Sequence, residues 1–269
     1  MSYLIKLIAL DLDNTLLNSN KEISEQNATT LKKLHNDGFK VVLCTGRPIN
    51  AVWNYVEQLN LLQPDDYTVT FNGGMVIRNI DKKVLFQDSL SLNDFKLLHD
   101  FANQNSLPLD ILDFKQVYSL VDLVQSDYKE VLNANLKFVS ASFNDLPDQK
   151  YSKAIMSASS NKLDDVRRYM PDIIKNNYHI VRSQPQIMEF LKPGVNKANG
   201  LERLLEKLNL NFSNLMTFGD AENDIEMLKS AKIGVVMDNA KTDIKKIGDD
   251  ITLDHDQDGV AYYLKKYFK

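Results

Sequence analysis

Strand-like apolar runs alternate with helix-like segments along most of this 269-residue chain. Residues 4–10 read as a buried strand. Ser24 can cap a following helix, which Gly38 ends before a second strand at 40–45. Such alternation is typical of a doubly wound, mostly parallel sheet, and it is not the pattern of a helical bundle or a β-sandwich. The sequence therefore predicts an α/β fold.

The alternation is interrupted once and then resumes, which predicts a discontinuous, Rossmann-like core. Core elements are expected as helices at 49–59, 197–208, 225–229 and 242–247 with a closing helix to residue 268, as strands at 67–71, 215–218, 233–236 and 251–253, and as a hairpin with arms 75–79 and 83–87. Between them the pattern changes to helices near 93–103 and 163–174 and strands near 151–157 and 179–183. We expect a core of residues 1–87 and 192–269 and an inserted α+β domain of residues 88–191.

Composition excludes several classes of protein. The net charge is −4, and 32 basic residues are dispersed among 36 acidic ones, which argues against a nucleic-acid binder or a protein of anionic membranes. Cys44 is the single cysteine, so there is no internal disulfide and no zinc site of several thiolates. Residues 1–10 are too short an apolar run to span a membrane and lack a secretory cleavage pattern. These features predict a cytoplasmic protein.

Two aspartates end the first strand. In LDLDNTLL, Asp11 and Asp13 are separated by one residue, so both emerge on one side at the carboxyl end of the strand, where open α/β sheets bind ligands. A carboxylate such as Asp11 can attack phosphorus, and Asp13 can protonate the leaving oxygen and later activate water. The backbone around Leu12 belongs to the predicted phosphate site. The alternative is an ordinary Asp-Asn turn after a strand.

Two further segments can supply phosphate ligands. Thr45 ends the second strand, and its hydroxyl with the backbone N–H of Gly46 can hold a phosphate oxygen, with Arg47 in support. Lys197 follows Pro193 and Gly194 at a predicted helix start, from which its ammonium can reach the site. Taken singly, a Thr-Gly pair is also a common strand-to-helix turn and a lysine is usually a surface residue.

The segment FGDAENDIEML adds acidic groups after another predicted strand. Asp220 can complete the oxygen ligands of a magnesium ion held by Asp11 and by the backbone carbonyl of Asp13. Asn223 can bind a phosphate oxygen, and Asp224 can orient the loop or Lys197. An acidic helix cap would explain Asp220 or Asp224 separately. A helix cap does not explain why both aspartates appear beside Asn223 in a chain that also carries the LDLDNTLL aspartates, the Thr45-Gly46 pair and Lys197.

These four stretches, in this order and with a long insertion between the second and third, resemble the haloacid dehalogenase superfamily of phosphohydrolases, and within it the Cof-type or class IIB sugar-phosphatase-like branch. The resemblance spans the whole chain. It implies that Asp11 is the nucleophile, that Asp13 is the acid/base, and that the inserted domain is a mobile cap that selects the substrate. Matching phosphate and metal residues are Thr45, Gly46, Lys197, Asp220, Asn223 and Asp224. Asn14 stands where the family usually has glycine, and we expect the loop to tolerate it.

The sequence thus predicts a magnesium-dependent phosphatase that hydrolyses a small phosphorylated metabolite through an aspartyl-phosphate intermediate, as a monomer or homodimer. By the resemblance, candidate substrates are sugar phosphates and phosphorylated cofactors such as pyridoxal phosphate or flavin mononucleotide. A phosphosugar mutase would instead transfer the group to a second sugar hydroxyl. A phosphoacceptor signalling module would form a stable phosphoprotein, and a silent metabolite binder would do no chemistry.

Overall fold

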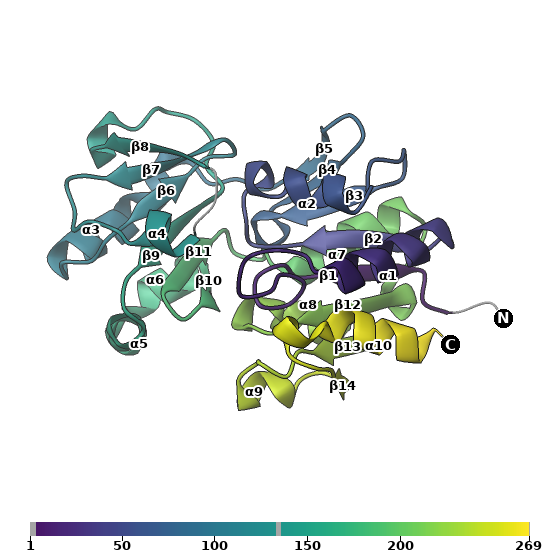
Figure 1. Cartoon of the computed structure of the whole chain (residues 1–269). Helices are drawn as coiled ribbons and strands as arrows, with labels where there is room; N and C mark the ends of the chain where they lie inside the picture. Colours follow the sequence, from purple (N-terminus) through teal and green to yellow (C-terminus); the bar gives the residue numbers. More distant parts are fainter. Residues whose placement is uncertain (1–3, 133–135, 269) are drawn as a thin grey trace. The chain divides into compact units, whose positions relative to one another are not determined.

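The computed structural model describes residues 4–132 and 136–268, which divide into two compact units (Figure 1). Unit 1 contains the chain up to residue 47, residues 52–87 and the chain from residue 196 onward. Unit 2 contains residues 48–51 and 88–195, so the segments 48–51 and 192–195, which the sequence placed in the core, fall in unit 2. The roles of the two units as catalytic core and cap stay predictions.

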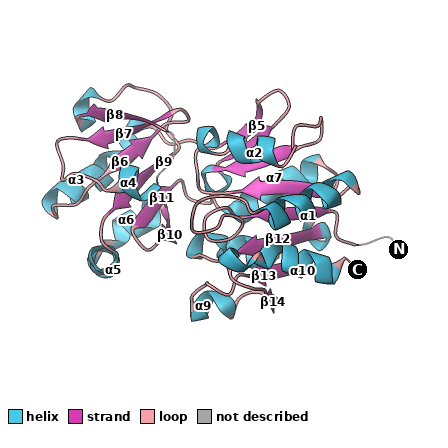
Figure 2. Cartoon of the chain, viewed as in Figure 1, coloured by secondary structure: helices cyan, strands magenta, loops and turns pink. Residues whose placement is uncertain are grey.

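Unit 1 is built on one eight-stranded sheet of order β14-β13-β12-β1-β2-β3-β4-β5 (Figure 2). Its strands are β1 (Leu7–Leu10), β2 (Lys40–Cys44), β3 (Tyr67–Thr70), β4 (Met75–Arg78), β5 (Lys83–Gln87), β12 (Leu215–Gly219), β13 (Ile233–Val236) and β14 (Asp250–Ile251). The strands from β14 to β3 pair in parallel, and the pairs β3–β4 and β4–β5 at one edge are antiparallel. This confirms the predicted doubly wound, mostly parallel α/β sheet.

Helices cover both faces of this sheet, as its continuous apolar strands require. They are α1 (Glu25–Asn36), α2 (Trp53–Gln58), α7 (Lys197–Lys207), α8 (Ile225–Ser230), α9 (Thr242–Lys245) and α10 (Gly259–Tyr267). α1 packs beside α10 and α7 beside α8. Leu201 of α7 and Met227 of α8 join alternate strand residues such as Leu7 and Ala9 in one buried cluster. Ser24 caps α1 as predicted, accepting a hydrogen bond from the backbone N–H of Asn27 at 3.1 Å.

Some predicted bounds in unit 1 were wrong. The segment 49–59 is not one helix, because Val52 has φ −123° and separates a short 3₁₀ turn, Ile49–Ala51, from α2. The predicted helix 242–247 ends at Lys245, and the predicted strand 251–253 contributes only its first residue to β14. None of these differences alters the strand ends that carry the predicted chemistry.

Unit 2 has a six-stranded sheet of order β10-β11-β9-β6-β7-β8, antiparallel except for the pair β7–β8. Its elements are β6 (Asp110–Leu112), β7 (Gln116–Leu120), β8 (Lys137–Ala141), β9 (Lys153–Ser157), β10 (His179–Gln184), β11 (Ile187–Leu191), α3 (Lys96–Gln104), α4 (Tyr128–Leu132), α5 (Ser160–Tyr169) and α6 (Asp172–Asn177). The larger apolar cluster joins the sheet to α3, α5 and α6, and a smaller one joins it to α4.

The sequence was least informative in unit 2. The predicted helix 163–174 is two helices, α5 and α6, because Pro171 has no backbone N–H and its ring cannot continue a helix. The strands β6, β7, β8 and β11 and the helix α4 were not predicted, since runs of three to five residues carry little periodicity. Across the described parts of the chain, no helix has the length and apolarity needed to cross a membrane.

Candidate active site

The predicted site residues of unit 1 follow the carboxyl ends of neighbouring strands. Asp11 follows β1, Thr45 follows β2 and Asp220 follows β12, and β1 lies between the other two strands in the sheet. Because these three strands are parallel, their carboxyl ends share one edge of the sheet. β1 is also the strand from which the chain builds the sheet outward in both directions, because it pairs with β2 on one side and with β12 on the other.

Lys197 lies at the centre of the site. Its ammonium donates to Asp11 Oδ1 at 2.5 Å and to Asp224 Oδ1 at 2.6 Å, and the side chain is fully buried. Burial opposes the charge of Lys197, but the carboxylates of Asp11 and Asp224 outweigh that effect and raise its pKa above the ordinary value. Lys197 is therefore a buried lysine whose ammonium form is stabilised by two carboxylates, and it is not a surface residue.

Three carboxylates form a cluster at this edge. Asp11, Asp220 and Asp224 each place an oxygen within 4.8 Å of the others. Burial and the neighbouring charge of Asp224 raise the pKa of Asp11 to about 7, although Lys197 opposes the rise. Burial and the charges of Asp11 and Asp224 likewise raise the pKa of Asp220 well above its usual range. One ammonium for three carboxylates leaves an excess of negative charge.

Such a cluster suits a divalent cation, since hard cations prefer carboxylate oxygens. The sequence assigned the metal site to the carboxylates of Asp11 and Asp220 and to the backbone carbonyl of Asp13, and that assignment stays a prediction. The structure adds the carboxylate of Asp224 beside those of Asp11 and Asp220, while the carboxylate of Asp13 pairs with Arg47 and Lys21. The other oxygen of Asp224 accepts the backbone N–H groups of Asp220 and Ala221, each at 3.0 Å, which fixes the loop.

Asp13 occupies a different electrostatic environment from Asp11. Arg47 donates two hydrogen bonds of 2.7 Å to the Asp13 carboxylate, and Lys21 donates a third of 2.9 Å. Burial by itself would raise the pKa of Asp13, but the hydrogen bonds and charges of Arg47 and Lys21 hold that pKa well below its usual range. Asp13 is therefore ionised in this arrangement.

The second predicted phosphate ligand lies at the end of β2. Thr45 is almost fully buried, and its hydroxyl oxygen accepts the backbone N–H of Arg47 at 3.1 Å. A hydroxyl that accepts one hydrogen bond keeps its proton to donate elsewhere. Gly46 lies between these two residues. The side chain of Leu12 is fully buried in the core, so only its main chain can meet a phosphate group.

The structure adds residues that the sequence did not single out as site residues. Asn223 donates from its amide nitrogen to Asn72 Oδ1 at 2.9 Å, and the hydroxyl of Thr15 donates to Asp220 Oδ1 at 3.0 Å. Asn72 follows β3, so the Asn-Gly-Gly signal after a third parallel strand could have been read as part of the site. No local signal marks Lys21, which reaches Asp13 from a loop eight residues away.

Backbone geometry explains two residues of the motifs. Asn14, which stands where the family usually has glycine, has φ 57°, in the left-handed region that asparagine tolerates better than most residues. The loop therefore accommodates asparagine at this position, as expected from the sequence. Gly219 ends β12, and a Cβ there would lie 2.6 Å from the Cβ of Asp224. Glycine at 219 therefore allows Asp224 to pack against the strand and reach Lys197.

Known proteins share this fold and sequence over nearly the whole chain. A family profile described as haloacid dehalogenase-like hydrolase matches residues 8–264. The chain is 30% identical to the 5-amino-6-(5-phospho-D-ribitylamino)uracil phosphatase YitU of Bacillus subtilis, over 97% of both chains. It is also 30% identical to a haloacid dehalogenase-like hydrolase from Bacteroides thetaiotaomicron, with a TM-score of 0.84 and coverage of 98% of this chain and 100% of the other.

A more distant structure shares the fold. The subclass IIB sugar phosphatase BT4131 aligns with a TM-score of 0.84 at 22% identity, covering 98% of this chain and 99% of its own. The family match, the identity with YitU and the clustered carboxylates agree with one another. The chain belongs to the haloacid dehalogenase-like hydrolases and is a phosphatase of that family.

Proposed function

We propose that this protein is a magnesium-dependent phosphatase that hydrolyses a small phosphorylated metabolite through an aspartyl-phosphate intermediate on Asp11. The observation that carries the proposal is the buried contact of Lys197 with both Asp11 and Asp224 at the carboxyl end of β1. This arrangement presents a carboxylate nucleophile beside a fixed positive charge, which an anionic substrate requires.

The acidic cluster supports the choice of cation. Asp11, Asp220 and Asp224 offer hard oxygen ligands, with Thr15 orienting Asp220 and backbone N–H groups orienting Asp224. A bound Mg²⁺ would neutralise phosphate charge and lower the repulsion between the substrate and the Asp11 carboxylate. It would also offset the repulsion among these carboxylates, which adds to the effect of burial in raising the pKa of Asp11 and of Asp220.

In the first step a carboxylate oxygen of Asp11 attacks phosphorus, and the bond between phosphorus and the ester oxygen breaks. Lys197, the Thr45 hydroxyl and the Asn223 amide would bind the non-bridging oxygens. The leaving oxygen takes a proton as it departs. Asp13 is the nearest acid by sequence, but in this arrangement Arg47 and Lys21 keep it ionised, so its protonation requires a change in those contacts.

In the second step water attacks the phosphoryl group on Asp11, releases inorganic phosphate and restores the carboxylate. Asp13 accepts the proton of that water. Its pairing with Arg47 and Lys21 keeps Asp13 unprotonated at neutral pH, as a base must be, but it also weakens that base, so accepting the proton requires the same change in those contacts as in the first step.

The substrate class is inferred from the relatives. YitU is named for a phosphate ester on a ribityl chain. We propose a sugar phosphate, a polyol phosphate or a phosphorylated cofactor for this chain, with unit 2 selecting among them, in the cytoplasm.

The test is a screen of phosphorylated metabolites with the purified protein and Mg²⁺, scored as inorganic phosphate released. Acetyl phosphate serves as a substrate with almost no leaving group for unit 2 to recognise. Multiple turnovers with a preference for larger esters would support the proposal. Transfer to a second sugar hydroxyl without phosphate release would indicate a mutase, and a stable stoichiometric phosphoprotein would indicate a signalling module.

A further inference from the structure

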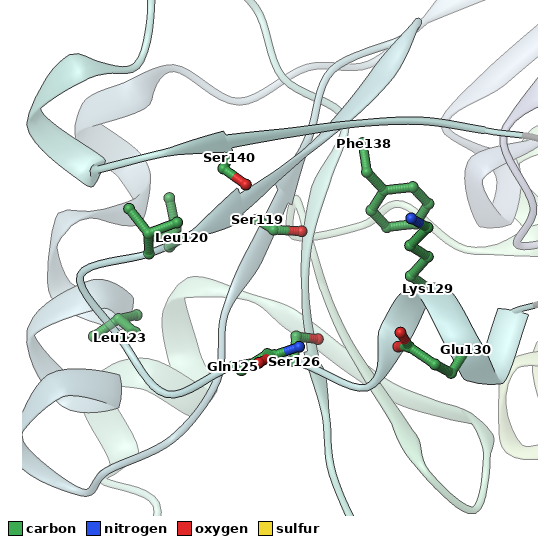
Figure 3. A pocket seen from close by; sticks show the side chains of 10 residues that line it. Ser119, Leu120, Leu123, Gln125, Ser126, Lys129, Glu130, Phe138 and Ser140 are labelled. Atoms are coloured by element: carbon green, nitrogen blue, oxygen red, sulfur yellow. The ribbon is translucent and has the colours of Figure 1, made fainter.

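Unit 2 contains a pocket of about 520 Å³ outside the site described above. Figure 3 shows Lys129 and Glu130 of α4 in its lining, with opposite charges, together with the hydroxyls of Ser119 and Ser126. The pocket therefore selects no single class of ligand by charge. The fully buried Asp110 of β6 is not among the described residues that line it, and burial raises the pKa of that carboxyl to about 6, although the hydroxyls of Ser119 and Ser126 oppose the rise.

Unit 1 has a more specific contact at the edge of the sheet that carries the site. Asn239 lies shortly after β13, which runs parallel to β12, so Asn239 lies at the same edge as Asp11 and Asp220. Its side-chain nitrogen donates to the backbone carbonyl of Asn14 at 2.8 Å, across 225 positions of the chain. Asn14 directly follows Asp13 in the loop that connects β1 to α1.

The side-chain amide of Asn239 has one possible orientation. Its oxygen accepts the backbone N–H of His255 at 3.1 Å, while its nitrogen donates to Asn14. A backbone carbonyl can only accept a hydrogen bond and a backbone N–H can only donate one, so these two partners fix which end of the amide faces each of them. Asn239 therefore binds the Asn14 carbonyl with a side chain that is itself held in place.

Asn14 is a residue whose backbone conformation needs support. Its φ of 57° lies in the left-handed region, which is less favourable for a residue with a Cβ than for glycine. The peptide group before its Cα contains the Asp13 carbonyl, and the peptide group after it contains the carbonyl that Asn239 binds. Because peptide groups are planar, holding the second group while Asn14 keeps its left-handed conformation also sets the direction of the first.

Two predicted contacts of the metal site lie on either side of this hydrogen bond. The Asp13 carbonyl before it is a predicted metal ligand. The hydroxyl of Thr15, the next residue after Asn14, donates at 3.0 Å to Asp220, another predicted ligand. A shift of the Asn14 peptide groups would move both contacts, and groups that orient metal ligands usually affect metal affinity.

We propose that Asn239 is a positioning residue of the metal site, which holds the Asn14 turn in the conformation that presents the Asp13 carbonyl and Thr15 to the cation. This role rests on the proposed function, because Mg²⁺ is part of that function. Asn239 acts through the backbone of Asn14, and it contacts neither the cation nor the substrate.

The alternative is that Asn239 only fastens two segments of the fold to each other. A second contact joins the same segments: the hydroxyl of Ser24, at the other end of the loop, donates to the carboxylate of Asp258. Ser24 also caps α1. Ser24→Ala should therefore lower the melting temperature at least as much as Asn239→Ala does. Since Ser24 is not next to Asp13 or Thr15 in the chain, its loss should leave the Mg²⁺ affinity unchanged.

The experiment measures Mg²⁺ binding to the full-length protein by calorimetry, without substrate. The heat recorded with Asp220→Ala belongs to other sites and is subtracted. We expect Asn239→Ala to raise the Mg²⁺ dissociation constant by about tenfold, and Ser24→Ala to keep that constant within about twofold of the parent value. At saturating Mg²⁺, the KM of Asn239→Ala for p-nitrophenyl phosphate should also stay within about twofold, because Asn239 does not contact the substrate.

Unchanged Mg²⁺ affinity in a folded Asn239→Ala protein would overturn the role of Asn239, and so would an equal loss of affinity in Ser24→Ala. If Asn239→Ala does not fold, Asn239→Leu takes its place, because it fills the same space and removes both hydrogen bonds. A parent protein that binds no Mg²⁺ would overturn both this role and the metal site of the proposed function. The binding assay needs no turnover, so a parent that binds Mg²⁺ but releases no phosphate would contradict the proposed phosphatase activity alone.

Discussion

Arg47 holds Asp13 in a two-point ion pair, with Nε 2.7 Å from Oδ2 and Nη2 2.7 Å from Oδ1. Both side chains are largely buried, so water does little to weaken the pair. The pair gives Asp13 an electrostatic environment different from that of Asp11. Burial and the nearby carboxylate of Asp224 raise the pKa of Asp11, whereas Arg47 and Lys21 lower the pKa of Asp13, two residues later, although it is buried too.

Arg47→Met should raise the pKa of Asp13, because burial then acts with only Lys21 opposing it. The carboxyl would need a higher pH to ionise and act as the base. We expect the acidic limb of the pH profile of kcat for p-nitrophenyl phosphate to move up by about one unit or more. Arg78→Met, which breaks the more exposed pair with Asp81, is the control and should leave the profile in place. An unmoved acidic limb in Arg47→Met would contradict the assignment of Asp13 as the base.

Asp11→Asn and Asp13→Asn should fail differently. Asp11→Asn removes the nucleophile, so turnover should fall by about a thousandfold or more while circular dichroism shows a folded protein. Asp13→Asn should slow water activation, so phosphoenzyme should accumulate with p-nitrophenyl phosphate, detected as a mass increase of one phosphoryl group on Asp11. Parent-like turnover in Asp11→Asn would exclude it as the nucleophile.

Mg²⁺ should raise the melting temperature of the parent protein, since it relieves the repulsion among Asp11, Asp220 and Asp224. A chelator should abolish activity, and added Mg²⁺ should restore it. Asp220→Ala should show neither the thermal shift nor the recovery. Asp243→Ala, at an exposed position of α9, is the matched control and should respond as the parent does. Full activity in chelator would refute the metal site.

Asn72 tests whether orientation of Asn223 contributes to catalysis. Asn72 has φ 54°, a left-handed backbone conformation that glycine adopts without strain. Asn72→Gly therefore removes the side-chain amide, which accepts a hydrogen bond from Asn223, without straining the backbone. We expect kcat/KM to fall by about tenfold, with little change in melting temperature. Asn60→Gly, at a residue with φ 56° outside the site, is the matched control. Equal effects of the two variants would mean that the Asn72 amide has no role in positioning.

Asp110 should make stability depend on pH with an unusual sign. Its pKa is about 6 in the folded state and 3.8 when unperturbed, so between these values the folded protein binds more protons than the unfolded chain. The free energy of unfolding therefore falls as pH rises from about 4 to about 6. Above pH 6, Asp110→Asn should be more stable than the parent by up to about 3 kcal/mol, and that advantage should shrink towards pH 4. Urea unfolding of both proteins at several pH values measures the difference, and a pH-independent difference would contradict it.

The sequence alone determined which residues end the core strands. Apolar runs, the Ser24 cap and the turn residues act over a few positions, so strand ends such as Asp11 and Asp220 could be located without the structure. Parallel pairing then brings them to one edge of the sheet. In unit 2 the same reasoning missed β6, β7, β8 and β11, because short strands are stabilised chiefly by their neighbours in the sheet.

Only the tertiary structure decided what each side chain does. Lys197 meets Asp11 across 186 positions of the chain, Thr15 meets Asp220 across 205, and Asn72 meets Asn223 across 151. Such contacts set burial and local charge, and these in turn set the opposite pKa shifts of Asp11 and Asp13, which identical side chains in one motif cannot reveal. Local sequence fixes where a carboxylate leaves a strand, and the fold fixes which charges surround it.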